Sequence, residues 1–97
     1  MSNKVRAHAI ISGRVQGVFF RMETKRAADS CEVLGWVKNR RDGTVEAVFE
    51  GNEENVNSIL EWCKDGPRLA DVKKMDVELE DYKGDYYEFE LRNNFPK

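Results

Sequence analysis

The spacing of apolar residues changes between two periods along this chain, and those changes restrict its fold more than any other feature. Apolar and polar residues alternate from Val5 to Ser12, which predicts a half-buried strand. From Phe20 to about Cys31 the apolar residues recur at helical spacing, which predicts a helix. Both patterns return later in the chain, so we expect strands and helices to share one core.

The later elements are predicted from the same apolar periodicity, bounded by glycine, proline or a capping residue. They are a strand at 36–40 after Gly35, a strand at 44–50 after the Asp42-Gly43 hairpin signal, a helix from Asn52 to Gly66-Pro67, and strands at 75–79 and 87–91. The order is β-α-β-β-α-β with an extra C-terminal strand. Helices that cross over between strands cover one sheet face, so we expect a ferredoxin-like α+β sandwich with a mostly antiparallel sheet, as a single domain over residues 1–97.

Composition excludes several classes of protein. The net charge is −2, from 16 basic and 18 acidic side chains, which argues against non-specific nucleic-acid binding. No apolar run approaches the ~20 residues of a membrane span, so we expect a cytoplasmic protein. The two cysteines, Cys31 and Cys63, lack CxxC spacing and fall on apolar helix stripes, so we expect buried thiols. One histidine with two dispersed cysteines offers no recognisable metal-ligand set.

The glycine-rich segment from Gly13 to Phe20 connects the first strand to the first helix. Gly13 and Gly17 allow backbone angles at which several N–H groups turn inward, and the helix adds its own unpaired N–H groups and positive dipole end. Arg21 follows in the first helical turn, where its guanidinium could bind the same anion bidentately. The alternative is a plain connector whose glycines relieve a tight turn. The spacing matches neither the Walker loop nor the dinucleotide motif.

Asn39 is a second candidate, because asparagine is depleted in strands. It either faces a site or marks a bulge or a surface position. Lys38, Arg40 and Arg41 around it would ordinarily form a solvated face, but beside an anion site they would raise the local positive potential.

The large apolar side chains of the loop are expected to be structural. We expect Phe19 and Phe20 to pack in the core, and Val15 and Val18 to hold the loop from below. No nucleophile is evident, because Ser12 has no adjacent base. We expect His8 to occupy a surface or helix-covered position of the first strand.

Three segments together resemble the acylphosphatase family: GRVQGVFFR at 13–21, GWVKN at 35–39 and GTVEAVFEG at 43–51. They match its loop, GxVQGVxFR, and its strand element, GxVxN, and the resemblance extends from about Val5 to Leu91. It implies hydrolysis of an acyl phosphate to a carboxylate and inorganic phosphate, without metal or other cofactor. Carried over by position, Arg21 would bind the phosphate and Asn39 would orient the attacking water. The backbone cradle would comprise Gly13, Arg14, Val15, Gln16, Gly17, Val18, Phe19 and Phe20.

Two other functions fit the same element order. A non-catalytic phosphate-binding module would keep the loop but show no turnover. An RNA-binding ferredoxin-like module would carry an RNP1 pattern of aromatic residues, which no strand here contains. Acylphosphatase-like domains also occur within larger carbamoyl-transfer maturation proteins, but the chain ends at Lys97, so we expect a free-standing enzyme. We expect a monomer that binds a small-molecule acyl phosphate, with no nucleic-acid or membrane partner.

Overall fold

The computed structural model describes residues 3–92 and contains seven elements in the predicted order. They are β1 (Lys4–Arg14), α1 (Phe20–Ser30), β2 (Leu34–Asn39), β3 (Val45–Asn52), α2 (Glu53–Asp65), β4 (Asp71–Glu80) and β5 (Phe89–Leu91). The main departures are at the C-terminal end, where β4 begins earlier than its apolar alternation and β5 has only three residues.

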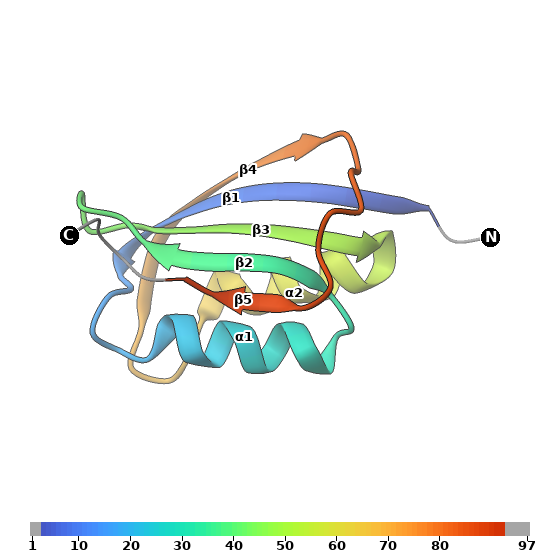
Figure 1. The fold of residues 1–97 in the computed structure, drawn as a ribbon. Coiled ribbons are helices and arrows are strands. Elements are labelled where there is room, and N and C mark those ends of the chain that lie inside the picture. The colour runs from blue at the N-terminus through green and yellow to red at the C-terminus, as the bar shows by residue number, and fades with distance from the viewer. Residues whose placement is uncertain (1–2, 93–97) are drawn as a thin grey trace.

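The sheet has the order β4-β1-β3-β2-β5, and both helices lie against one of its faces (Figure 1). Every neighbouring pair is antiparallel except β2 and β5, which are parallel. The predicted ferredoxin-like α+β sandwich is therefore confirmed. None of the helices in residues 3–92 is long and apolar enough to cross a membrane.

The core lies between the sheet and the two helices. Alternate residues of β1 and β3 point toward the helices, and Phe49 stacks on Phe89 with ring centroids 5.6 Å apart. Buried residues of α1 and α2 complete this core: Phe20, Thr24, Ala28, Val56, Ile59 and Cys63. Cys63 is buried and Cys31 half-buried, and both are free thiols. Burial raises the pKa of the Cys63 thiol to about 12, so it stays protonated.

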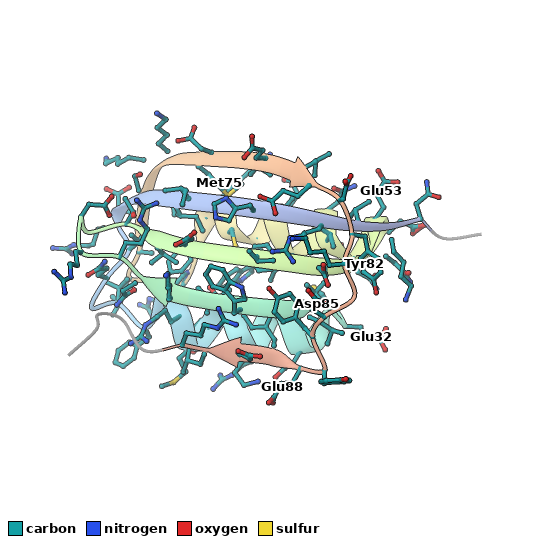
Figure 2. All side chains as sticks on the ribbon, turned by 45° about the horizontal axis from the view of Figure 1, so that its top comes forward. Glu32, Glu53, Met75, Tyr82, Asp85 and Glu88 are labelled. Carbon is teal, nitrogen blue, oxygen red and sulfur yellow. The ribbon has the colours of Figure 1, made fainter. Side chains whose placement is uncertain are left out.

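The helix-free face of the sheet carries one buried carboxylate, Glu50. Its oxygens accept hydrogen bonds from Arg6 Nη1 at 3.1 Å and from the backbone N–H groups of Lys83 and Gly84 at 3.0 and 3.2 Å. These bonds tie the segment between β4 and β5 to the sheet. Figure 2 shows Tyr82 and Asp85 on this segment, which crosses in front of the helix-free face of the sheet to reach β5.

The alternation predicted at 75–79 and 87–91 does not produce a fully buried face. Val77 and Leu79 are exposed on β4, which lies at the edge of the sheet. Tyr87 is 98% exposed, so the last strand is shorter than its pattern predicted. Ahead of β5, the N–H groups of Lys83 and Gly84 bond to the Glu50 side chain, and Glu88 accepts one long bond of 3.5 Å from Gly35 of β2.

We predict that Glu50→Ala lowers the free energy of unfolding by about 2–3 kcal/mol, because the mostly buried Arg6 guanidinium and the N–H groups of Lys83 and Gly84 lose their shared acceptor. The measurement is urea unfolding, with Glu78→Ala, an exposed carboxylate of β4, as the matched control. Equal stability of the two variants would contradict the role assigned to Glu50.

Candidate functional site

The connection between β1 and α1 exposes a run of backbone donors. Within residues 3–92, the N–H groups from Val15 to Phe19 donate to no backbone carbonyl group. Gly17 has a φ of 74° and Phe19 a φ of 63°, which turns the chain sharply before the helix. The first N–H groups of α1 also lack intrahelical partners, as in any helix, and carry the positive end of its dipole. Free donors of this kind bind anions.

Side chains hold this loop in place. Val15 and Val18 are buried in the core, as predicted. Gln16 Nε2 donates to the carbonyl oxygens of Arg40 and Thr44 at 2.7 and 2.9 Å, which fixes the loop to the β2–β3 hairpin. The side chain of Gln16 therefore has a supporting role, and only its backbone N–H is free for a ligand.

Arg21 lies in the first turn of α1, and its position depends on the last strand. Its Nη1 donates to the carbonyl oxygen of Arg92 at 2.8 Å, just beyond β5. A guanidinium has five N–H donors in a fixed planar arrangement. This single bond therefore orients the group and leaves further donors for an anion.

Asn39 ends β2 and has an unusual side-chain environment. The residue is only 8% exposed, and its Oδ1 is buried without a hydrogen-bond partner among residues 3–92. A buried acceptor without a partner is costly and uncommon in native proteins, and it often marks a functional group. The sequence left open a surface position for Asn39. That alternative is wrong, because the residue is buried beside a cavity.

These groups meet around one cavity of about 230 Å³, lined by Val15, Gly17, Phe19, Phe20, Arg21, Met22, Asn39 and Leu91. Of the residues named from the resemblance, four do not line it: Gly13, Arg14, Gln16 and Val18. Gly13 and Arg14 belong to β1 and pair with Val72 and Asp71 of β4. Sequence reasoning missed Met22 and Leu91. Met22 directly follows Arg21 in the first turn of α1, and this closeness to the predicted arginine was the signal that could have placed it at the site.

The predicted packing of the loop phenylalanines is confirmed for one of them. Phe20 is buried and packs against Trp62 with ring centroids 5.8 Å apart. Phe19 is 64% exposed, so its predicted core position is wrong. As the N-cap of α1 it adopts a left-handed conformation, which costs a non-glycine residue about 1–2 kcal/mol and turns its ring away from the core.

Two of the three basic residues around Asn39 lie beside carboxylates at the surface. Lys38 lies 3.7 Å from Glu46, and Arg40 lies 3.5 Å from Asp42. Hydrogen bonds from Thr44 hold the pKa of the Asp42 carboxyl below its usual value and close the hairpin. None of these side chains lines the cavity.

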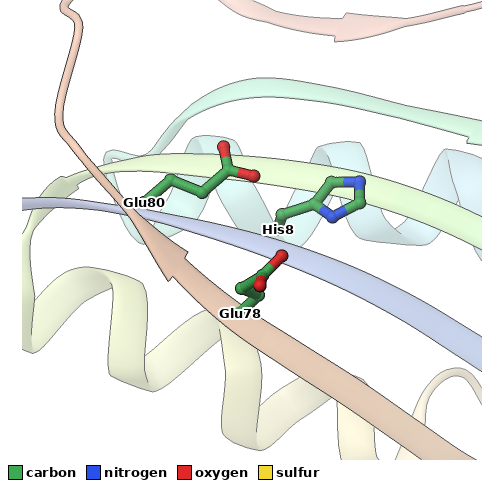
Figure 3. A group of neighbouring side chains, drawn as sticks. All are labelled: His8, Glu78 and Glu80. Carbon is green, nitrogen blue, oxygen red and sulfur yellow. The ribbon is translucent and has the colours of Figure 1, made fainter.

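One group of side chains could hold a metal ion by the type of its atoms: His8, Glu78 and Glu80 on the helix-free face (Figure 3). Two of them already have partners. His8 Nε2 lies 2.6 Å from a Glu46 oxygen, and Arg6 Nε donates to Glu80 at 2.8 Å, which lowers the pKa of the Glu80 carboxyl. This group does not line the cavity, and its bonds are those of an ion-pair network.

Comparison with known proteins identifies similar chains. A model of the acylphosphatase family matches residues 7–91. The chain is 47% identical to an acylphosphatase from Pelotomaculum thermopropionicum over 89 residues, which cover 92% of this chain and 97% of that protein. The solved acylphosphatase structure from Coxiella burnetii superposes with a TM-score of 0.88 at 37% identity, covering 93% of this chain and 94% of that one. The structure of acylphosphatase from Bacillus subtilis gives 0.87 at 35% identity, with 91% and 98% covered.

We predict that Gln16→Leu weakens binding of inorganic phosphate about tenfold, because it removes both bonds from the loop to the hairpin, worth about 1.4 kcal/mol of loop order. Titration calorimetry measures the affinity. Asn57→Leu, the same kind of change on the exposed side of α2, is the control. Unchanged phosphate affinity in Gln16→Leu would show that the loop keeps its shape without these bonds.

Proposed function

Because this chain belongs to the acylphosphatase family, we propose that it hydrolyses an acyl phosphate to a carboxylate and inorganic phosphate in the cavity between the β1–α1 loop, α1 and β2. The observation that carries this proposal is the buried, unpartnered Oδ1 of Asn39 beside Arg21 and the free loop N–H groups. An anion cradle alone would need no such acceptor, whereas a hydrolase needs a group that receives a hydrogen bond from water.

Phosphate binding is assigned to the loop and to Arg21. The N–H groups of Val15 to Phe19, those of the first turn of α1 and the guanidinium surround the phosphoryl oxygens. In phosphoryl transfer the protein mainly positions the reactants and stabilises charge on the equatorial oxygens. Fixed N–H donors and one arginine supply that charge stabilisation from the protein itself, and this supports a reaction without a metal ion or other cofactor.

We assign to Asn39 the role of orienting the attacking water. Its side-chain amide, at the lining of the cavity, hydrogen-bonds to the water and holds the water oxygen in line with the bond from phosphorus to the acyl oxygen. The new bond forms between the water oxygen and phosphorus, and the old bond breaks as the acyl oxygen leaves with its electron pair. An amide is no base at neutral pH, so the water's proton passes to a phosphate oxygen of the substrate.

The leaving group explains why so few side chains suffice. The departing oxygen becomes part of a carboxylate, whose conjugate acid has a pKa of about 4. Such a group leaves without protonation, so no general acid is required on its side. The site then needs only to bind, orient and stabilise charge.

The ion pairs of the helix-free sheet face support the absence of a nucleic-acid partner. An RNA-binding module of this fold uses that face, but here Arg6 is paired with Glu50 and Glu80, and Lys38 lies 3.7 Å from Glu46, so neither cation is free for a phosphate. We further propose that the protein acts as a monomeric, single-domain enzyme in the cytoplasm. The two free cysteines support a reducing compartment.

We predict that the wild type hydrolyses benzoyl phosphate in the presence of EDTA and that Asn39→Ala lowers kcat about 10²-fold with little change in KM. Asn39→Ala should unfold at the same or a higher temperature than the wild type, because the lost oxygen has no partner in the fold. Loss of stability in parallel with activity would contradict a role in water orientation.

We predict that Arg21→Ala raises both KM and the inhibition constant of inorganic phosphate and also lowers kcat, by about 10²–10³-fold in kcat/KM. Arg14→Ala is the control, because Arg14 is an exposed arginine of β1 that does not line the cavity. A wild type that binds phosphate but shows no turnover would make the protein a phosphate-binding module instead.

A further inference from the structure

The mouth of the cavity is apolar. Phe19, Met22 and Leu91 line the cavity, and they are 64%, 52% and 44% exposed. Phe19 is the N-cap of α1 and Met22 lies in the first turn of that helix, while Leu91 comes from β5. Single exposed apolar side chains are ordinary on a protein surface, but a group around one cavity indicates a contact surface. We refer to these three residues as the apolar rim.

The identity of Phe19 is not explained by the fold. Its left-handed backbone favours glycine or asparagine, and as N-cap of α1 it makes no capping hydrogen bond with its side chain. Because the ring is mostly exposed, core packing does not require it either. The feature that Phe19 does border is the cavity.

The geometry of the proposed reaction places the acyl group at this rim. Water attacks phosphorus from the side opposite the leaving oxygen. Asn39, which holds the water, is buried, whereas the rim residues are exposed at the mouth. With the phosphate bound below by the loop and Arg21, the acyl group leads away from Asn39 and passes over the rim.

We propose that the apolar rim is the acyl-binding surface and that it selects acyl phosphates with an aromatic or alkyl acyl group of about benzoyl size. This inference rests on the proposed function, because it assigns the acyl half of that substrate. Arg21 is the one charged side chain among the residues lining the cavity, and the phosphoryl group occupies it. An acyl group that carries a second phosphate, or a small polar one, would meet only apolar carbon at the rim.

The first test compares kcat/KM for benzoyl phosphate and acetyl phosphate. We expect the ratio of benzoyl to acetyl to fall about tenfold in Phe19→Asn, since an apolar contact of this size changes kcat/KM by roughly that factor. Tyr87→Asn, the same kind of aromatic-to-asparagine change at a 98% exposed position away from the cavity, should keep the wild-type ratio. Thermal unfolding of Phe19→Asn should match or exceed the wild type, because asparagine tolerates this backbone and can cap α1.

The outcomes separate this inference from the function on which it rests. An equal loss on both substrates in Phe19→Asn would overturn the acyl contact of the rim and show that the Phe19 side chain affects only phosphate binding by the loop. If the wild type hydrolyses neither substrate, the proposed function fails. Calorimetric binding of benzylphosphonate and methylphosphonate, which needs no turnover, then tests the rim by itself. Tighter binding of benzylphosphonate that Phe19→Asn abolishes would support the apolar rim, and equal binding of the two phosphonates would overturn it.

Discussion

The unpaired N–H groups between Val15 and Phe19 are the constraint around which the rest of the site is arranged. Backbone donors in a folded protein usually find partners, so a loop that keeps them free must be held by other means. Here two valines anchor the loop in the core, and the Gln16 amide bonds to the neighbouring hairpin. These side-chain contacts hold the loop in place, and its backbone N–H groups remain available to bind an anion.

The two assigned catalytic side chains reach the loop from different parts of the fold. Asn39 arrives at the end of a central strand, where the ladder with β3 fixes its backbone. Arg21 arrives on α1 and is oriented by a carbonyl just beyond β5. The site therefore exists only where a strand–helix connection, a hairpin and the final strand meet, and the sheet order brings these three together at one end.

Periodicity and motif spacing predict much of this structure, and their failures have physical causes. The elements up to α2 follow from local pattern, and the loop with Arg21 and Asn39 follows from the spacing of GRVQGVFFR and GWVKN. The exposure of Phe19 does not follow from the local pattern. Helical periodicity would place this side chain in the core, but the left-handed backbone directs it to the surface. The contribution of Leu91 depends on which strand β5 pairs with, and Glu50 determines where the preceding segment lies. Contacts of this long range leave no local signature in the sequence.

Given the proposed role of Arg21 in phosphate binding, its bond to the Arg92 carbonyl makes activity depend on the least extensive strand of the sheet. β5 pairs with β2 through three residues, whereas β4, β1, β3 and β2 form longer ladders that do not involve it. A local opening of this strand releases the arginine while the four longer strands stay folded, and such sub-global openings have lower free energies than global unfolding. On heating, the enzyme would therefore lose catalysis before it loses its fold, and amide hydrogens of β5 would exchange at the rate at which activity fades.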